Sequence, residues 1–331
     1  MKILVTGSDG FIGSHLVEAL INIGLNVRAF TFYNSQNNRG CLEYLDTKVL
    51  KKLDIISGDI RDPFEVDKAV KGCDYVLNLA ALIGIPYSYV APKNYLDTNV
   101  AGTLNILEAS KRYQVKRVIL TSTSEVYGTA QKIPINENHP LNAQSPYAAS
   151  KIAADQLGIS YFKSFNLPVT IIRPFNTFGP RQSGRAIIPT ILLQIFYGSK
   201  FIKIGNLKPT RDFNFINDTV AAFVMALNNK KIISGEVINI GSGFEISIYE
   251  LFLLIKKLVN KDIYLKQSNL RKRHFNTEVE RLIADNAKAK KILKWKPSYS
   301  GRKGLIKGLI ETIEWFKKSK NLEKYKDIYN I

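Results

Sequence analysis

Cysteine is scarce in this chain, which has only Cys41 and Cys73 among its 331 residues. Two thiols cannot build a disulfide framework or a cysteine-based metal site. The three histidines, His15, His139 and His274, lack the spacing of a metal site or of a catalytic triad. We therefore expect a protein of the reducing cytoplasm that holds no metal.

Long apolar runs are also missing. No segment reaches the roughly 18 consecutive apolar residues that a membrane-spanning helix requires. The apolar start, residues 1–7, is too short for a secretory signal peptide. Apolar residues make up 45% and charged residues 23% of the chain, as in an ordinary globular protein of one large or two modest domains. No membrane partner is expected.

Acidic residues are in the minority, since 28 Asp and Glu against 47 Lys and Arg give a formal charge of +19. Such an excess can indicate nucleic acid, an anionic membrane or a small phosphorylated ligand. Many of the lysines, such as Lys256, Lys257 and Lys288, fall on amphipathic helical patterns, and no nucleic-acid-binding motif accompanies them. We interpret most of the charge as solvated surface, with a few cations left for a phosphorylated substrate and no nucleic acid partner.

A glycine-rich turn stands at the N-terminus between two expected elements. The apolar stretch Lys2–Thr6 predicts a buried strand, the next residues predict a helix that ends at Gly24, and Val27–Phe32 predicts a second strand. Strand, glycine turn, helix and strand in this order are typical of a dinucleotide-binding unit, whose helix N-terminus binds the pyrophosphate. The glycines are spaced by three, unlike the general G-x-G-x-x-G pattern. The candidate cofactor-binding residues here are Gly7, Asp9, Gly10, Phe11, Ile12 and Gly13.

The second expected strand is not followed by a carboxylate. An acidic residue at that point would bind the ribose hydroxyls of NAD, but the sequence from Ala29 to Asn34 has none. Arg28 and Arg39 are nearby cations for the 2′-phosphate of NADP, or are ordinary surface charges. The choice between NAD and NADP stays open.

Strands and helices continue to alternate as far as Pro174. The expected strands are Ile55–Gly58, Tyr75–Ala81, Arg117–Thr121 and Val169–Pro174. Regular alternation with right-handed crossovers predicts an α/β fold with a Rossmann-like, doubly wound parallel sheet. Asp59 and Ile60 follow one strand and are expected over the adenine. Leu79, Ala80 and Ala81 are small enough to admit the cofactor closely, and Asn99 is expected to bridge backbone beneath the site.

The pattern breaks after Pro174. We expect a loop at Phe175–Arg181, a helix at Ile187–Phe196, and then short strands at Phe201–Ile204, Asn214–Ile216 and Glu236–Ile240. This predicts a dinucleotide-binding domain over residues 1–174 and a smaller α/β substrate domain over residues 175–331. The two are interleaved, because residues 211–240 are expected to return in part to the first domain.

Reactive side chains gather between Ile119 and Lys151. An apolar strand leads into the hydroxyls of Thr123 and Ser124 and the carboxylate of Glu125. These groups are expected where the strand ends, which is the edge where ligands bind in parallel sheets.

A helix is expected to begin at Ser145, a residue type that caps helices, with Pro146 at its first position. Tyr147 and Lys151 then stand one turn apart on one face, about 6 Å along the axis. A neighbouring ammonium favours the ionised phenol. We therefore expect Lys151 to lower the pKa of Tyr147.

Together these residues resemble the extended short-chain dehydrogenase/reductase family, and the resemblance covers nearly the whole chain. The motifs that carry it are Gly7-x-x-Gly10-x-x-Gly13, Asn78-Leu79-Ala80-Ala81, Tyr147-x-x-x-Lys151, Arg173-Pro174-Phe175-Asn176-x-x-Gly179-Pro180, and Arg211-Asp212-Phe213 with Asp218. Within the family the chain looks like the NDP-N-acetylglucosamine 4,6-dehydratases of the legionaminic-acid and related nonulosonate pathways. Segments 81–89, 122–130 and 277–282 and Arg273 carry that closer likeness.

The resemblance implies a reaction at three sugar carbons. Carbon 4 is oxidised by hydride transfer to NAD or NADP, with Tyr147 taking the hydroxyl proton and Thr123 bonding the same oxygen. Glu125 then removes the proton from carbon 5, and water leaves from carbon 6. The hydride returns to carbon 6, so a tightly bound cofactor is regenerated each turnover. Ser124 stands where dTDP-glucose dehydratases have an aspartic acid; GDP-mannose dehydratases also have serine there.

The resemblance also implies the substrate-binding residues and the oligomeric state. Asn176, Arg211 and Arg273 resemble residues that hold a nucleotide diphosphate, although Arg271, Lys272 and His274 compete with Arg273 for that role. The full candidate substrate set is Ile85, Pro86, Tyr87, Asn176, Arg185, Ile188, Arg211, Arg273 and Glu278. A homodimer is implied, formed by the helices after Asn94 and from Tyr147.

Several functions stay open beside a 4,6-dehydratase of UDP- or GDP-N-acetylglucosamine. A UDP-glucuronate decarboxylase would need a cation for the carbon-6 carboxylate. A 4-epimerase would need no base at carbon 5, which Glu125 argues against. A dehydratase could also release the 5,6-ene instead of returning the hydride. A non-catalytic dinucleotide sensor would not need Thr123, Tyr147 and Lys151 together.

Overall fold

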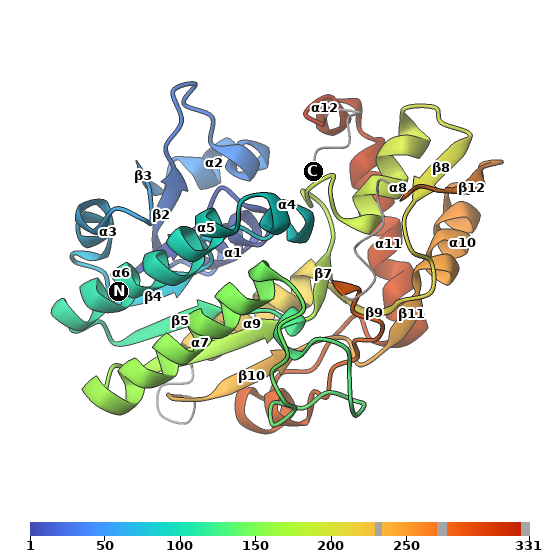
Figure 1. Ribbon diagram of the computed structural model, residues 1–331. Helices are drawn as coiled ribbons and strands as arrows, with labels where there is room; N and C mark the ends of the chain where they lie inside the picture. Colours follow the sequence, from blue (N-terminus) through green and yellow to red (C-terminus); the bar gives the residue numbers. More distant parts are fainter. Residues whose placement is uncertain (229–233, 270–276, 326–331) are drawn as a thin grey trace.

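A parallel sheet of seven strands forms the centre of the protein (Figure 1). The structure is a computed structural model that describes residues 1–228, 234–269 and 277–325. The strand order is β10-β6-β5-β4-β1-β2-β3, and all neighbours are parallel. The strands are β1 (Lys2–Thr6), β2 (Asn26–Phe32), β3 (Asp54–Gly58), β4 (Tyr75–Asn78), β5 (Arg117–Thr121), β6 (Val169–Pro174) and β10 (Val237–Ile240).

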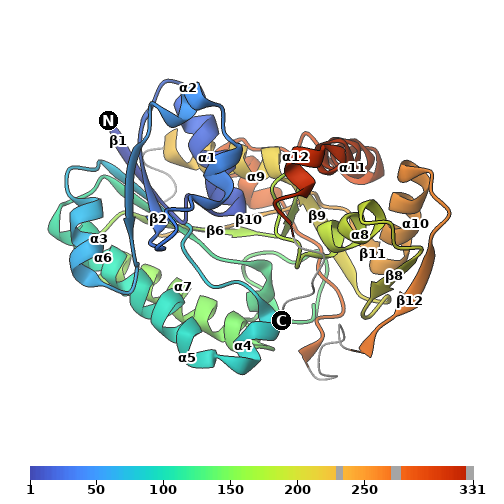
Figure 2. The ribbon, with the colours of Figure 1, turned by 90° about the horizontal axis from the view of Figure 1, so that it is seen from above.

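Helices cover both faces of this sheet (Figure 2). On one face lie α1 (Phe11–Asn22) and α9 (Ile216–Asn228), which pack on each other. On the other face α6 (Gly102–Arg112) packs between α3 (Pro63–Val70) and α7 (Pro146–Phe165). The predicted Rossmann-like, doubly wound α/β fold is therefore confirmed.

The alternation of β1 shows why both faces are needed. Ile3 and Val5 belong to the hydrophobic core under α1, whereas Leu4 belongs to the core under α3 and α6. All three side chains are fully buried, because successive residues of a strand point to opposite faces. A strand buried on both faces reads as a continuous apolar run, as seen in the sequence.

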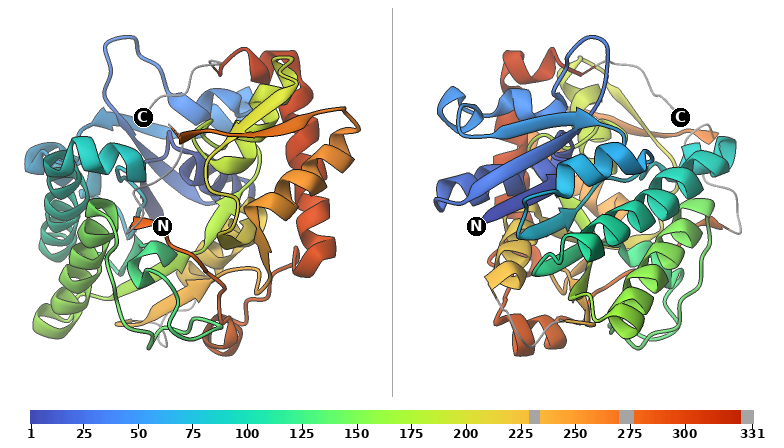
Figure 3. Two further views of the ribbon diagram at one scale, coloured as in Figure 1. Left: turned by 45° about the vertical axis from the view of Figure 1, so that its right-hand side comes forward. Right: turned by 90° about the vertical axis from the view of Figure 1, so that its left-hand side faces the viewer.

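The remaining strands form two small sheets beside the carboxyl edge of the large one. One has the order β11-β9-β7 and the other pairs β12 with β8. These strands are β7 (Asn176–Phe178), β8 (Phe201–Ile204), β9 (Thr210–Phe215), β11 (Glu245–Ser247) and β12 (Tyr264–Gln267). Figure 3 shows them with α8 (Ile187–Phe196), α10 (Ile248–Val259) and α11 (Gly301–Lys317).

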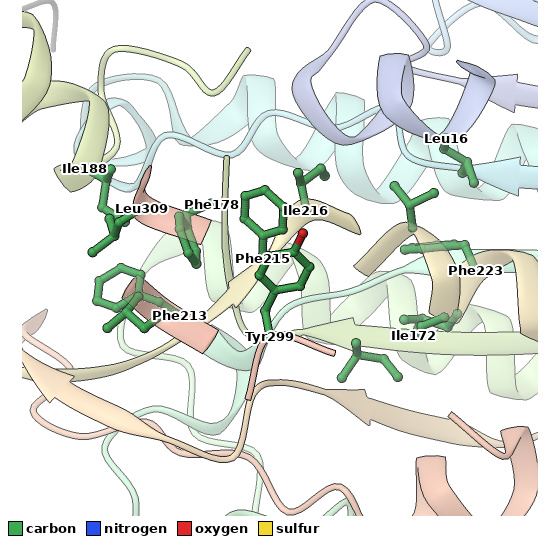
Figure 4. Close-up of a cluster of buried hydrophobic side chains, with 14 of the residues drawn as sticks. Leu16, Ile172, Phe178, Ile188, Phe213, Phe215, Ile216, Phe223, Tyr299 and Leu309 are labelled. Carbon is green, nitrogen blue, oxygen red and sulfur yellow. The ribbon is translucent and has the colours of Figure 1, made fainter. Parts of the chain in front are cut away.

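A continuous hydrophobic core joins these elements to the large sheet (Figure 4). Phe213 and Phe215 of β9 lie in it with Phe178 of β7, and the Phe178 ring contacts both at centroid distances of 6.2 and 5.4 Å. Leu16 of α1 and Ile172 of β6 belong to the same core. The division into two domains stays a prediction, but this core is shared.

Short elements complete the chain. They are η1 (Gly40–Tyr44), α2 (Thr47–Leu50), α4 (Ile85–Val90), α5 (Pro92–Tyr95), η2 (Leu96–Ala101), η3 (Ser124–Tyr127), η6 (Ala289–Leu293) and α12 (Ser319–Leu322). No helix in the described ranges is long and apolar enough to span a membrane. The same ranges contain no group of three His, Cys, Asp or Glu residues placed to hold a metal ion.

Some predicted bounds were wrong. The expected loop at 175–181 contains β7, which pairs in parallel with β9; three residues are too few to show an alternating pattern. The expected strand 214–216 is the end of β9, which begins at Thr210, and Ile216 already starts α9. The expected strand Tyr75–Ala81 ends at Asn78.

Candidate active site

The turn between β1 and α1 leaves no room for a side chain at Gly7 or Gly13. Gly7 has φ +61, and a Cβ there would lie 2.8 Å from Ala80 N. A Cβ on Gly13 would lie 2.1 Å from the carbonyl oxygen of Gly7. At Gly10 the helix starts without a side-chain cap. The first N–H groups of α1 are therefore open to an anionic ligand, which is what a pyrophosphate site needs.

The end of β4 is tied to this turn by the hydroxyl of Thr6. That oxygen donates to Asn78 Oδ1 at 2.6 Å and accepts from the backbone N–H groups of Leu79 and Ala80, each at 3.1 Å. The predicted cofactor residues Leu79 and Ala80 thus lie directly beside Gly7. Ala81 follows them in the chain.

A carboxylate does lie at the end of β2, but Asp9 supplies it from the glycine turn. Asp9 Oδ2 accepts from Phe32 N at 3.1 Å. Burial raises the pKa of this carboxyl, against hydrogen bonds that lower it. The sequence pattern concerns only the residues after β2, so it did not predict that Asp9 would lie at the end of this strand.

Arg28 does not face the expected cofactor position. Its Nε donates to Asp54 Oδ2 at 2.8 Å, and its Nη1 donates to the carbonyls of Ala69 and Lys71 at 2.9 and 2.8 Å. The guanidinium is thus engaged on the α3 side of the sheet, which removes it as a partner for a 2′-phosphate. Arg39 is exposed.

Asn99 bridges backbone, as predicted. Its Oδ1 accepts from Leu82 N at 2.8 Å, and its Nδ2 donates to Leu82 O at 3.0 Å and Ser150 Oγ at 2.9 Å. It therefore fixes the segment after β4 against α7. The carboxylate of Asp59 is bound by the guanidinium of Arg61, and Ile60 is buried against Gly102.

The turn η3 carries the predicted hydroxyls and carboxylate. Thr123 caps it, since its Oγ1 accepts from Glu125 N at 3.2 Å. Ser124 and Glu125 are both buried. The strand itself ends at Thr121, two residues earlier, so these groups project from a turn at the carboxyl edge of the sheet.

Helix α7 brings the phenol to the same place. Ser145 caps it by accepting from Ala148 N at 3.1 Å, and Pro146 occupies its first position, as predicted. Tyr147 makes a hydrogen bond with Thr123 and lies close enough to Glu125 to sense its charge. The structure thus brings together Thr123, Glu125 and Tyr147, which come from two separate elements.

The predicted lowering of the Tyr147 pKa by Lys151 and the cationic nicotinamide stays a prediction, and burial acts against it. Burial raises the pKa of Tyr147; the hydrogen bond with Thr123 opposes the rise and Glu125 adds to it. Lys151 Nζ donates to the carbonyl oxygen of Thr121. Burial lowers the pKa of Lys151 to about 8, and the carboxylate of Asp155 opposes this. Burial therefore favours the neutral form of the Tyr147 phenol.

Aromatic side chains line the other side of the phenol. The ring of Tyr95 meets that of Tyr147 edge-on at 6.2 Å, and Tyr87 lies 6.2 Å from Tyr95. Ile85 is buried in the same small cluster. Tyr95 was not predicted: it is the last residue of the short helix α5, and no motif marks it.

A cavity of ≈270 Å³ holds most of the predicted substrate residues. Its lining includes Pro86, Asn176, Arg185, Ile188, Arg211 and Glu278. Arg211 is buried, and its Nη2 lies 3.4 Å from Glu278 Oε1. Arg273 falls outside the described residues. Six predicted residues distant in sequence thus share one cavity, which also has Gln182 in its wall.

A larger hollow of ≈740 Å³ lies elsewhere, between Gly243 and Asn286. None of the residues predicted for the site lines it. The smaller cavity is the better candidate, because cations, apolar side chains and the first turn of α4 converge on it.

Comparisons with known proteins agree with this geometry. The model of the family described as GDP-mannose 4,6 dehydratase matches residues 4–307. A putative UDP-glucose 4-epimerase of Methanocaldococcus jannaschii is 32% identical over 321 residues, or 95% of this chain and 98% of the relative. A UDP-N-acetyl-alpha-D-glucosaminuronate decarboxylase of Bacillus cytotoxicus is 33% identical over 332 residues, covering 97% and 99%.

The solved structures point the same way. A dTDP-glucose 4,6-dehydratase of Streptomyces venezuelae, crystallised with NAD, matches with a TM-score of 0.87 and 27% identity, covering 97% of this chain and 98% of that one. Epimerase, decarboxylase and dehydratase therefore all occur among relatives at similar identity. The chain belongs to the GDP-mannose 4,6-dehydratase family, the NAD-dependent sugar-nucleotide dehydratases and epimerases of the extended short-chain dehydrogenase/reductase group.

Proposed function

We propose that this protein is a nucleotide-sugar 4,6-dehydratase acting on UDP- or GDP-N-acetylglucosamine. The observation that carries the proposal is the placement of Glu125. Its carboxylate is buried on the turn that also presents Thr123, and it lies near the phenol of Tyr147. A base beside the oxidation site is what elimination after oxidation requires, and epimerisation at carbon 4 has no use for it.

The glycine turn would hold NAD(P), which would supply a hydride acceptor for carbon 4 and a positive charge in its oxidised form. Tyr147 takes the proton from the carbon-4 hydroxyl. Because burial raises the pKa of the phenol, deprotonation needs cations, and Lys151 is the chain's own contribution to them. Thr123 holds the oxygen that loses the proton.

Glu125 acts on the ketone that results. A carbonyl at carbon 4 acidifies the proton on carbon 5, which the carboxylate removes as the carbon-6 hydroxyl leaves as water. Ser124 occupies the place of the second acid and is buried beside Glu125. A serine hydroxyl is a weak acid, so we assign protonation of the leaving hydroxide to Glu125 as well.

Arg211 and Arg185 are proposed to hold the nucleotide diphosphate in the cavity, since a guanidinium binds phosphate oxygens through paired N–H groups. Glu278 keeps Arg211 in position through their contact. Asn176 and Ile188 complete the wall.

A UDP-glucuronate decarboxylase is the second candidate, and Arg185 favours it. The Nη1 atom of Arg185 lies 3.2 Å from the place where a Cβ of Gly84 would be. Gly84 O accepts from the hydroxyl of Tyr95, whose ring packs on Tyr147. The Gly84 backbone and the Tyr95 side chain link this cation to the phenol, which makes Arg185 the candidate partner for a carbon-6 carboxylate.

The test is incubation of the purified protein in D2O with UDP-N-acetylglucosamine, GDP-N-acetylglucosamine and UDP-glucuronate separately. We expect loss of one water from an N-acetylglucosamine nucleotide and deuterium at carbon 5, read by mass spectrometry and NMR. A 4-keto-6-deoxy product and a 5,6-ene are distinguished by the same spectra. Carbon dioxide release from UDP-glucuronate, or a carbon-4 epimer with its carbon-5 hydrogen retained, would overturn the dehydratase assignment.

A homodimer is also proposed, formed by the elements that pack beside α7. Leu96 on η2 is 53% exposed and Val90 on α4 is 70% exposed. Sedimentation should show a dimer for the wild type and a monomer for Leu96→Glu, since a buried charge would weaken an apolar interface. Phe64→Glu, at an exposed position on α3, is the matched control and should stay dimeric. A monomeric wild type would refute the proposal.

A further inference from the structure

A buried ion pair lies directly beneath the reactive turn. Asp155 of α7 and Arg173 of β6 are joined with Nη2 to Oδ2 at 2.9 Å, and their side chains are only 2% and 3% exposed. Arg173 Nε donates to the same oxygen at 3.0 Å. Asp155 stands one turn after Lys151 and two turns after Tyr147 on the same helix. The pair therefore links the helix of the phenol to the strand beside it.

The pair reaches both ends of the segment that carries the reactive groups. At the front, Ser122 Oγ donates to Asp155 Oδ2 at 2.7 Å. At the back, Arg173 Nη1 donates to the hydroxyl of Tyr127 at 2.9 Å, and its guanidinium stands over the Tyr127 ring at 5.0 Å. Thr123, Ser124, Glu125 and Val126 are the residues between these two anchors.

From the rear anchor, the Arg173–Tyr127 contact, the hydrogen bonds continue into the sheet. The Tyr127 hydroxyl donates to Asn239 Oδ1 at 2.7 Å, and Asn239 Nδ2 donates to Ile135 O at 3.0 Å. Asn239 N donates to Glu137 Oε1 at 2.8 Å. A chain of hydrogen bonds thus runs from α7 to β10 with every side-chain group on it bonded to a neighbour.

Stability alone does not account for this arrangement. Two buried charges lose hydration, and well-packed apolar residues of the same volume are often as stabilising. Such pairs are retained where a particular geometry matters. Here the geometry at stake is the distance between the turn after β5 and helix α7, which the Thr123–Tyr147 and Lys151–Thr121 hydrogen bonds also span.

We propose that Asp155 and Arg173 form a positioning unit that holds Thr123 and Glu125 in register with Tyr147. The unit acts through Ser122 and Tyr127 and touches neither substrate nor cofactor. The effect of this unit on hydride transfer at carbon 4 is expected whichever reaction of the family the protein catalyses. Its effect on proton removal at carbon 5 rests on the proposed dehydratase function.

The experiment uses Tyr127→Phe, which keeps the ring and the ion pair and removes only the rear anchor. Misplacement of a reacting group by about 1 Å can cost 10²-fold in rate, so we expect kcat to fall about tenfold. KM should stay within about twofold, because the diphosphate residues are untouched. Hydride transfer is followed as reduction of the bound cofactor by substrate, and carbon-5 exchange by deuterium incorporation.

The matched control is Tyr161→Phe. Tyr161 is also a buried tyrosine, but it lies on α7 and its hydroxyl donates to the carboxylate of Glu108. This variant should lose stability without a change in kcat. Asp155→Glu should recover part of the rate that Asp155→Asn loses. Wild-type hydride transfer and exchange in Tyr127→Phe would overturn the positioning unit. Absence of carbon-5 exchange in the wild type would overturn the dehydratase instead, and the hydride-transfer arm would still test the unit.

Discussion

Glu125→Gln is expected to lower the rate of dehydration by 10² to 10⁴-fold, the usual contribution of a general base. The amide has the same shape as the carboxylate but cannot take a proton. It also fits the buried turn, whose backbone hydrogen bond runs between Thr123 Oγ1 and Glu125 N and does not use the side chain. Folding should therefore be preserved, and the loss should be confined to carbon 5.

The measurement for Glu125→Gln separates the two half-reactions. Oxidation at carbon 4 should persist, so substrate should convert the bound cofactor to its reduced form and leave it there. Deuterium should no longer enter carbon 5. Glu108→Gln serves as the control, since Glu108 is a carboxylate on α6 that accepts from the Tyr161 hydroxyl outside the site; its turnover should equal that of the wild type. Normal turnover in Glu125→Gln would remove Glu125 from the mechanism.

The sequence predicted several helices and strands well. The bounds of β1, β5, β6 and α8 agree with the expected ones to the residue. These segments are continuous apolar runs that end at glycine, proline or polar residues, so local pattern alone decides them. The short strands after Pro174 were less predictable, because β7 and β11 have three residues each and exist only by pairing with β9.

The residues of the site also divide into those that local sequence predicts and those that it does not. Thr123, Glu125, Tyr147 and Lys151 lie within 29 residues of one another and carry a motif, so their convergence was foreseen. Tyr95 and Asp155 were missed. The bond of Asp155 with Arg173, 18 residues away, depends on the tertiary fold. The Tyr127–Asn239 bond, which continues the same network, spans 112 residues. No spacing rule reports contacts of that kind.

Burial is the part of the electrostatics that the sequence pattern did not predict. Helical spacing places Tyr147 and Lys151 on one face, which suggests a phenol made acidic by its neighbour. Spacing does not report burial, and burial acts on both groups in the direction of neutrality. It raises the pKa of Tyr147 and lowers that of Lys151 to about 8. The phenol must therefore be activated within the loaded site.

Tyr147→Phe is expected to stop the reaction one step earlier than Glu125→Gln, with a loss of 10² to 10⁴-fold in hydride transfer. Without the phenol the base assigned to the carbon-4 hydroxyl is gone. The hydroxyl of Thr123 cannot replace it, because it can accept that proton only by giving up its own. Substrate should therefore fail to reduce the bound cofactor. Carbon-5 exchange should be lost as well, because no ketone forms to acidify that proton.

Together, Glu125→Gln and Tyr147→Phe should thus show that oxidation at carbon 4 precedes proton removal at carbon 5. Reduced cofactor should accumulate in Glu125→Gln and be absent in Tyr147→Phe, as followed by absorbance after mixing with substrate. Tyr95→Phe controls for the loss of a hydroxyl in the same aromatic cluster, where the Tyr95 hydroxyl donates to Gly84 O. It should keep hydride transfer. Reduced cofactor in Tyr147→Phe at the wild-type rate would show that another base serves carbon 4, and the convergence on η3 and α7 would then need another explanation.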